Sequence, residues 1–377
     1  YDPQDMGYLS KHVQKAIRIP HPEKEPDAFL KAMLDHADAF GHGFLMPTSD
    51  VALKALSYYK PALEEHYIVG CADWETTQHM FEKQYTYTLA EELSVPHPIT
   101  HVPRSLEEVD SYIDALEYPC LVKPNESHLF YATFGSKMFY VNTPQELHAA
   151  CEKAFGAGLD IMLQEWIPGK AHNGANYNAY FIDGDPVAEF TAQKIRSGPA
   201  TFGSPSSLIT QHIDGVIESG RRMMKALNYT GYACTEFKRD DRDGVYKLIE
   251  INGRHNLSTL LAVRTGINFP LLHYRHLVDG KVLENLDFED GVYWIDLYRD
   301  LGYSWQNYKA DHPPLSEFIQ PYIGRRKVFA IVDRHDPKPF YKRSRDLFQR
   351  ASSSLMHRLH LNGPESGSLE RTVSESV

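Results

Sequence analysis

Residues 246–256 read YKLIEINGRHN, a stretch that puts an acid, an amide and a guanidinium group on one short predicted strand. Side chains alternate between the two faces of a strand, so Glu250 and Asn252 project to one side and the isoleucines beside them project to the other. Carboxylate and amide oxygens are suitable ligands for Mg²⁺, and the donor fork of Arg254 suits a phosphate group. The stretch therefore predicts a metal and phosphate site on a strand with an apolar core behind it.

A second strand is predicted just upstream, over residues 231–240 (GYACTEFKRD), and the turn residues DRDG connect it to the first. If the two strands form a hairpin, Glu236 lies beside Glu250. The sequence leaves the pairing register of the two strands open by one or two residues. The alternative is that these acids are solvated charges on an exposed strand face, where most glutamates lie. The second acid and the apolar opposite face favour the metal site.

Composition limits the classes of protein that the chain can belong to. Its 377 residues, of which 42% are hydrophobic and 24% charged, are enough for two or three domains. The net charge of -11 argues against a nucleic-acid partner bound through a broad basic field. The four cysteines are widely spaced, which predicts buried thiols in a reducing compartment, and neither a membrane-spanning run nor a signal pattern is visible. We therefore expect a cytoplasmic location.

The order of predicted elements changes near residue 100. Before it, helical spacing over 26–40 and 76–93 alternates with short apolar runs, which predicts a parallel sheet with crossover helices. After it, short strands and hairpins dominate, and residues 339–362 form a basic, partly amphipathic helix. This helix is either a docked surface helix or an attachment to an anionic membrane, for which Leu347, Leu355 and Leu359 are the candidate interfacial residues.

Cations suited to a nucleoside triphosphate occur at several predicted strand and helix positions. Lys123 ends the buried strand CLVKP, and Lys83 lies on a helix. Lys194 and Arg196 alternate onto one strand face, where they can hold a phosphoryl group during transfer. For each of these residues the alternative is a charge that simply faces water.

The loop over residues 125–136, NESHLFYATFGS, is small and polar at both ends and is a candidate lid over phosphates. The chain contains neither a GxxxxGK[ST] motif nor a GxGxxG motif after a strand. A P-loop kinase and a Rossmann dehydrogenase are therefore poorly supported.

Taken in chain order, these motifs resemble the ATP-grasp superfamily, and most closely its carboxylate-amine ligase-like branch. Within that branch the resemblance is to carbamoyl-phosphate-synthase-like ATP-grasp proteins, and a D-aspartate-ligase-like protein is one option. The resemblance spans residues 10–335, and TEFK followed by LIEINGR is its most specific part. It implies an α/β (α+β) fold in which two α+β subdomains grip ATP. A partial pre-ATP-grasp domain precedes them, since the opening strand and glycine turn of that domain are missing and the chain begins with Tyr, which predicts a fragment.

The resemblance also implies a domain order. The implied parts are a partial pre-ATP-grasp domain with a linker helix over residues 1–100, a small subdomain with the lid loop over 101–168, a large subdomain with the metal and phosphate site over 169–335, and a basic helix with a disordered tail over 336–377.

Roles follow from the resemblance residue by residue. His172 is the candidate for the ribose, because the acid usual at that point of the family is absent. The other implied roles are phosphate and adenine contacts for Lys83, Lys123 and Lys137, the adenine-edge strand for Glu165, Trp166 and Ile167, magnesium ligands for Glu236, Glu250 and Asn252, and catalytic cations for Lys194, Arg196 and Arg254.

The implied chemistry is activation of a carboxylate by ATP as an acyl phosphate, followed by attack of an amine or another nucleophile and release of ADP and phosphate. The implied cofactors are ATP and two Mg²⁺ ions, with Mn²⁺ as an alternative metal. The implied substrates are small molecules, with no nucleic acid, and the basic C-terminal segment is a candidate membrane contact. Two alternatives stay open: a small-molecule kinase, and an ATP-binding module without activity that is recruited to a membrane.

Overall fold

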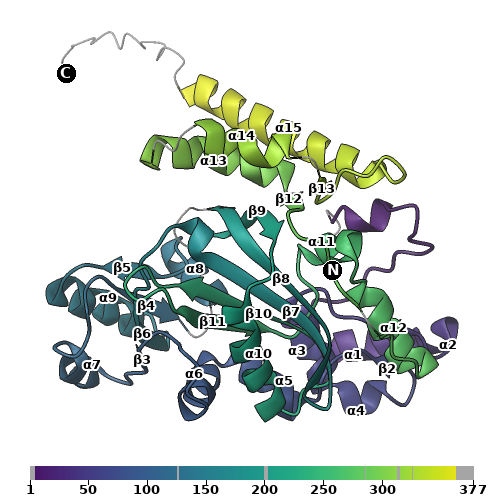
Figure 1. Cartoon of the computed structure of the whole chain (residues 1–377), viewed down its shortest axis with the longest axis horizontal. Coiled ribbons are helices and arrows are strands. Elements are labelled where there is room, and N and C mark those ends of the chain that lie inside the picture. Colours follow the sequence, from purple (N-terminus) through teal and green to yellow (C-terminus); the bar gives the residue numbers. More distant parts are fainter. Residues whose placement is uncertain are drawn as a thin grey trace, which may run out of the picture. The chain divides into compact units, whose positions relative to one another are not determined.

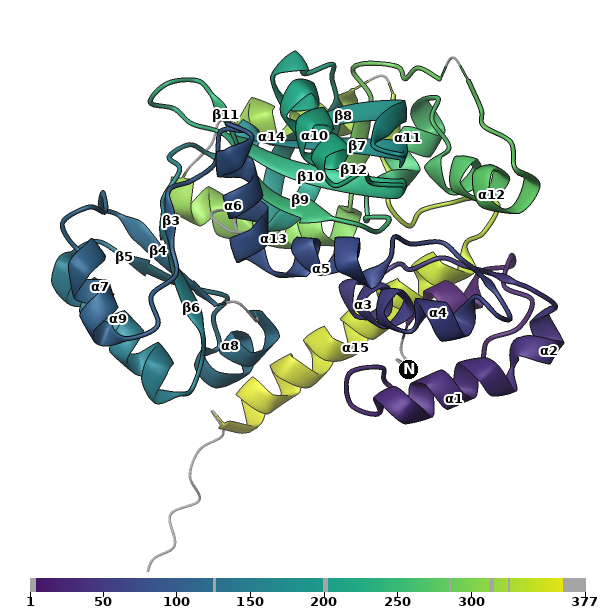
Figure 2. The same cartoon turned by 90° about the horizontal axis from the view of Figure 1, so that it is seen from below.

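The computed structural model describes residues 5–124, 127–198, 203–284, 286–311, 315–324 and 326–361. The chain divides into two compact units, of which Ile19–Ala330 is one, and Tyr1–Arg18 together with Ile331–Val377 is the other. Figures 1 and 2 show the mixture of helices and sheets that confirms the predicted α+β class. The domain boundaries near residues 100, 168 and 335 stay predictions.

The first part of the larger unit contains a short parallel strand pair surrounded by helices. Phe44 and Leu45 pair in parallel with Ile68 and Val69, which confirms the predicted parallel pairing. The elements here are α1 (Pro26–Asp35), α2 (Ala37–Phe40), β1 (Phe44–Leu45), α3 (Asp50–Tyr58), α4 (Lys60–Leu63), β2 (Ile68–Val69), α5 (Trp74–Phe81) and α6 (Lys83–Glu92).

A four-stranded antiparallel sheet follows, with the strand order β3-β6-β4-β5. Its helices bury Val109, Leu147 and Cys151 against strand residues such as Val122 and Leu163. The elements are β3 (Thr100–His101), α7 (Leu106–Tyr112), β4 (Cys120–Pro124), α8 (Ser127–Phe134), β5 (Phe139–Val141), α9 (Pro144–Gly156) and β6 (Ile161–Glu165).

A seven-stranded sheet forms the largest layer of this unit, with the strand order β11-β10-β7-β8-β9-β12-β13. The hairpin of β10 and β11 lies at one edge of the sheet. The elements are η2 (Ala171–Asn173), β7 (Gly174–Ile182), β8 (Asp185–Gly198), β9 (Ser204–Thr210), α10 (Asp214–Ala226), β10 (Gly231–Arg239), β11 (Tyr246–Asn252), α11 (Thr259–Thr265), α12 (Phe269–Asp279), β12 (Tyr293–Ile295), α13 (Leu297–Asp311), α14 (Leu315–Ile323) and β13 (Lys327–Phe329).

The two faces of the large sheet bury different hydrophobic clusters. On one face, Tyr177, Phe237 and Leu248 pack against Met223 of α10. On the other face, Tyr232 packs with residues of α11 and α12. Glu236 lies four residues after Tyr232 on the same strand and therefore on this second face. The apolar cluster under α10 thus supports the hairpin from behind.

Two predicted helices are each interrupted by one residue. The helix predicted over 26–40 breaks at His36 into α1 and α2. The helix predicted over 76–93 breaks at Glu82, whose φ of -89° and ψ of 94° are extended rather than helical. The second break makes Lys83 the first residue of α6.

The segment predicted as a lid loop over 125–136 is largely helical. Residues 125 and 126 lie outside the described part of the chain, and α8 occupies Ser127–Phe134. Phe130 and Phe134 lie one turn apart on this helix, and Phe130 is fully buried against Phe139. The prediction of a loop rested on the polar residues at both ends of the segment and did not take account of the aromatic residues, which are spaced as in a helix.

The smaller unit contains η1 (Gly7–Leu9) and the long helix α15 (Lys338–Leu361), which confirms the predicted basic helix. The disordered tail predicted after it lies outside the described residues. None of the helices in the described residues is both long enough and apolar enough to cross a membrane. The four cysteines are free and buried, as the sequence predicts.

The close approach of α10 to the sheet leads to a stability prediction. A Cβ atom on Gly220 would lie 2.2 Å from Cδ1 of Tyr177. In an isolated helix, replacing glycine by alanine is stabilising by about 1 kcal/mol. At Gly220 the close contact with Tyr177 should make the same replacement destabilising. We expect Gly220→Ala to lower the free energy of unfolding by about 1–3 kcal/mol in urea titrations. Gly156→Ala in α9, where a Cβ meets nothing within 4 Å, is the control, and an equal effect of both changes would contradict the packing.

Candidate functional site

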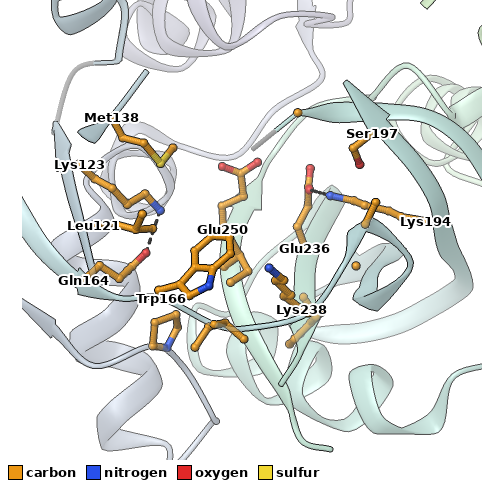
Figure 3. Close-up of a pocket in the computed structure, with 18 of the residues that line it drawn as sticks. Leu121, Lys123, Met138, Gln164, Trp166, Lys194, Ser197, Glu236, Lys238 and Glu250 are labelled. Carbon is orange, nitrogen blue, oxygen red and sulfur yellow. Dashed lines mark hydrogen bonds and ion pairs between the residues drawn. The ribbon is translucent and has the colours of Figure 1, made fainter. Parts of the chain in front are cut away.

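A pocket of about 330 Å³ is lined by residues from both the four-stranded and the seven-stranded sheet. Figure 3 shows Lys123 and Met138 on one side, Lys194 and Glu236 on the other, and Glu250 between them. Apolar residues line another part of the wall, and these are Pro98, Leu121, Met138, Trp166, Ile167 and Phe237.

Two carboxylates of the β10 and β11 hairpin lie directly opposite each other. Glu236 and Glu250 are register partners, and a bulge follows immediately between Glu236 and Phe237. Burial raises the pKa of Glu236, Lys194 opposes that rise, and the neighbouring Glu250 adds to it. Two like charges at one place favour either a shared proton or a bound cation.

Lysines surround the acid pair on several sides. Lys194 Nζ donates to Glu236 Oε2 at 2.7 Å. Burial by itself raises the pKa of Glu250, but the charges of Lys83, Lys123 and Lys194 and a hydrogen bond from Asn252 bring it below its ordinary value. Of the two acids, Glu250 is therefore the one whose ionised form its neighbours favour more.

Lys123 is the most deeply buried cation of the pocket, with 7% of its surface exposed. Its Nζ donates to Gln164 Oε1 at 2.8 Å, and Gln164 Nε2 donates to Thr100 Oγ1 at 2.9 Å. Burial, with the charge of Lys83 as the second cause, lowers the pKa of Lys123 to about 7. An anion in the pocket would stabilise its charged form.

The acid pair suits a hard divalent cation, with an amide as the third donor. Among the described residues no group of three His, Cys, Asp or Glu side chains is arranged to hold a metal ion. Asn252 lies next to Glu250, with Nδ2 at 3.3 Å from Glu250 Oε1. Two carboxylates and one amide leave coordination positions for oxygens of a bound substrate, as is usual for Mg²⁺.

A neighbouring pocket of about 390 Å³ lies along the edge strand β11. It shares Lys83, Ile249 and Glu250 with the first pocket, and Asn252 and Asp50 line it as well. The two pockets therefore meet at Glu250, so molecules bound in them would be close together there.

The predicted adenine-edge residues divide into two roles. Trp166 and Ile167 line the pocket, and Lys238 Nζ lies 4.1 Å from the centre of the Trp166 ring. Glu165 lines the pocket too, and its side chain accepts from the backbone N–H of Ile99 at 3.0 Å and pairs with Lys247 and Arg242. Its carboxylate fixes the end of β6.

Of three more predicted residues, Lys137 lines the pocket, and Arg254 and His172 do not. Lys137 lines it from the segment just before β5. Arg254 lies beside Asn252, but Asp50 holds its guanidinium group in a two-point ion pair with distances of 2.8 and 2.9 Å. His172 is exposed in η2, and its side chain does not line the pocket.

Arg196 is not brought to the pocket, although Lys194 is. A register shift between β8 and β9 separates the two residues, so the expected alternation is broken. The Arg196 guanidinium donates to both carboxylate oxygens of the fully buried Asp300, at 2.8 and 2.5 Å. The geometry indicates a packing role for Arg196 in place of the predicted phosphate contact.

Three residues near the acid pair received no role from the sequence. Lys238 follows Glu236 by two positions, and the alternation of the predicted strand already puts it on the face of Glu236. Gln164 contacts Lys123, and only the pairing of β4 with β6 reveals that contact. Asn176 is the β7 register partner of Glu236, and its buried Oδ1 has no hydrogen-bond partner among the described residues.

Comparisons with known proteins find similar proteins, although no family model matches the chain. The chain is 26% identical to D-aspartate ligase of Enterococcus faecium over 272 residues, which are 66% of this chain and 63% of that protein. Its structure is similar to that of L-amino acid ligase from Bacillus licheniformis, with a TM-score of 0.53 and 20% identity over 72% of this chain and 64% of that one.

A third likeness is to the biotin carboxylase domain of 2-oxoglutarate carboxylase from Hydrogenobacter thermophilus, solved with MgADP, ADP and bicarbonate. The TM-score is 0.56 at 17% identity, over 71% of this chain and 61% of that one. The chain spans less than two thirds of the length of each of these three proteins. The two structural likenesses concern the fold.

The environment of Arg196 predicts a loss of stability on its removal. Arg196→Ala would leave the buried Asp300 charge without its cation, and among the described residues the hydroxyls of Ser206 and Tyr322 would be its remaining donors. We expect the free energy of unfolding to fall by about 3–5 kcal/mol in denaturant titrations. Replacing both partners, as Arg196→Met with Asp300→Leu, should recover much of the loss. An unchanged stability of Arg196→Ala would contradict the packing role.

Proposed function

We propose that this chain, which has the ATP-grasp fold that its sequence predicts, is an ATP-dependent carboxylate-amine ligase. The observation that carries the proposal is the acid pair Glu236 and Glu250, with lysines around it, at the junction of two pockets. A sequence relative supports it, because D-aspartate ligase is named for ligation of an amino acid.

The residues of the first pocket fit a nucleotide with magnesium. Glu236, Glu250 and Asn252 would hold the metal, and Lys123 and Lys83 would hold phosphate oxygens. The apolar wall, which includes Trp166, offers a slot for a base next to the backbone of residues 165–167. When bound, the metal neutralises phosphate charge and polarises the phosphoryl group that is transferred. Two ions, with Mn²⁺ as an alternative to Mg²⁺, are part of this proposal.

The residues around the acid pair would orient and stabilise the reactants without a protein nucleophile. Cys234 is the nearest thiol on the face that carries Glu236, and its burial raises its pKa well above the ordinary value, which leaves it protonated. Lys194 and Lys123 approach the acid pair from opposite sides, where charge builds up as a phosphoryl group moves. Positioning and charge stabilisation are therefore the contributions of this chain.

The second pocket suits the carboxylate that is activated. It meets the nucleotide pocket at Lys83 and Glu250, so a carboxylate bound there would lie beside the phosphate end of ATP. Attack on the γ-phosphorus would give an acyl phosphate and ADP, and attack by an amine would then release phosphate and form the C–N bond. Small-molecule carboxylates and amines, reacting in the cytoplasm, are the substrates of this proposal.

The ligase proposal predicts substrate-dependent ADP formation that needs Glu250. We expect Glu250→Gln to reduce ADP release by about a thousandfold or more, because it removes an anionic ligand of the metal that stabilises phosphoryl transfer. The measurement is ADP release with pooled carboxylic and amino acids, followed by mass spectrometry of the product. Glu218→Gln, an exposed acid on α10, is the matched control and should turn over normally.

The product distinguishes the ligase from its alternatives. An amide product supports the ligase, whereas a stable phosphorylated product without an amide would identify a kinase. Nucleotide binding without any substrate-dependent ADP release would identify a non-catalytic module. Normal turnover by Glu250→Gln would contradict the proposed site.

The lowered pKa of Lys123 predicts that nucleotide affinity depends on pH. In the free protein Lys123 loses its proton near pH 7, and bound phosphates would raise its pKa. The affinity for MgADP should therefore be greatest below about pH 7 and weaken by up to about tenfold for each further pH unit. Calorimetric titrations at several pH values measure this dependence. Lys123→Met should bind more weakly at low pH and show a flat profile, and a flat wild-type profile would contradict the account.

A further inference from the structure

Charge is distributed unevenly between the two units of the chain. The described residues of the smaller unit, 5–18 and 331–361, contain ten Lys and Arg against four Asp, a formal charge of +6. The whole chain carries -11. We call these described residues the basic unit. The remainder of the chain therefore has a strongly acidic net charge, and the net charge of the basic unit favours contact with an extended anionic surface.

The two sequence segments of the basic unit are joined by hydrogen bonds at the start of α15. Ser10 Oγ donates to Asp336 Oδ2 at 2.5 Å, and the backbone N–H of Lys11 donates to Asp336 Oδ1 at 3.1 Å. These bonds hold the exposed Lys11 and Lys15 near the beginning of the basic helix. Cations distant in sequence thus belong to one folded element.

One face of α15 combines exposed aromatic rings with a cation. Tyr341 and Phe348 are 66% and 74% exposed, and the Arg345 side chain between them is 67% exposed. Their spacing of four and three residues places all three on the same side of the helix. The single acid of residues 338–349, Asp346, pairs with Lys342 at 2.7 Å, and both side chains are largely covered. We call Tyr341, Arg345 and Phe348 the aromatic face.

The aromatic face consists of other residues than the interfacial ones that the sequence predicts. Leu347, a predicted interfacial residue, is half-buried. The side chains of Leu355 and Leu359 lie outside the part of α15 that the structure describes, so their prediction stands untested. Among the described side chains of α15, the large exposed hydrophobic ones are Tyr341 and Phe348.

We propose that the basic unit binds an anionic membrane surface, with α15 lying in the plane of the interface. The Lys and Arg side chains face acidic headgroups, and Tyr341 and Phe348 enter the boundary between headgroups and acyl chains. The positive charge of the basic unit complements such a surface. In this arrangement the described part of α15 lies on the membrane and does not span it.

A lipid surface accounts for both features of the basic unit. Acidic headgroups use the charge, and the acyl boundary uses the rings. A nucleic acid would use the charge through its phosphates and would stack bases on the rings, and the test below separates the two partners. Two exposed rings and a cation on one face of a long helix favour the lipid surface, because an interfacial helix presents such a face.

Co-sedimentation of the full chain with vesicles tests the proposal. We expect binding to phosphatidylcholine vesicles that contain phosphatidylserine, little binding to phosphatidylcholine alone, and loss of binding as salt is raised. The double change Tyr341→Ala with Phe348→Ala should weaken binding by about tenfold or more, because two rings no longer leave water. Tyr58→Ala, which removes a 59% exposed ring of the other unit, is the matched control and should bind normally.

Charge reversal gives an independent arm of the test. Lys11→Glu, Lys15→Glu and Arg345→Glu together should abolish vesicle binding, while circular dichroism and substrate-dependent ADP release stay unchanged. Equal binding to both kinds of vesicle, or full binding by the double aromatic variant, would overturn the proposal. Failure of the unmodified chain to bind vesicles would overturn it too, and retention of a single-stranded oligonucleotide in that case would assign the surface to nucleic acid.

Discussion

The opposed carboxylates of Glu236 and Glu250 are the constraint on which the site depends. Adjacent strands bring the two acids into register, and the apolar face beneath the hairpin prevents them from turning away from each other. The surrounding lysines balance this charge without pairing it completely, because Lys194 is the one lysine of the described residues that makes a close ion pair with the acid pair. A fold that keeps two acids together in a lysine-lined pocket is prepared for a divalent cation and phosphates.

Much of this arrangement could be predicted from the sequence, because strand alternation and turn residues are local signals. The alternation of side chains in YKLIEIN and GYACTEFK indicates which residues of each strand share a face. The turn residues between the two strands indicate the hairpin. The register of Glu236 with Glu250 lay within the range that this reasoning allowed. The order of the lysines along the chain supplied the family resemblance, and the structure brings Lys83, Lys123, Lys137 and Lys194 to one pocket.

The parts that could not be predicted depend on tertiary contacts. The bulge after Lys194 turns Arg196 toward Asp300, which is more than a hundred residues away in sequence. Gln164 reaches Lys123 only because β4 and β6 pair. The polar ends of residues 125–136 suggested a loop, whereas burial of Phe130 stabilises a helix there. In each case packing between distant segments overrode a local pattern.

The central claim is that the β10 and β11 hairpin binds the metal of a nucleotide. The most direct measurement is a crystal structure of the full chain with Mn²⁺ and ADP, in which anomalous scattering locates the metal. The account predicts a manganese peak bound by carboxylate oxygens of Glu236 and Glu250, with the diphosphate beside Lys123. A nucleotide bound in this pocket with manganese elsewhere, or a nucleotide bound in a different pocket, would contradict it.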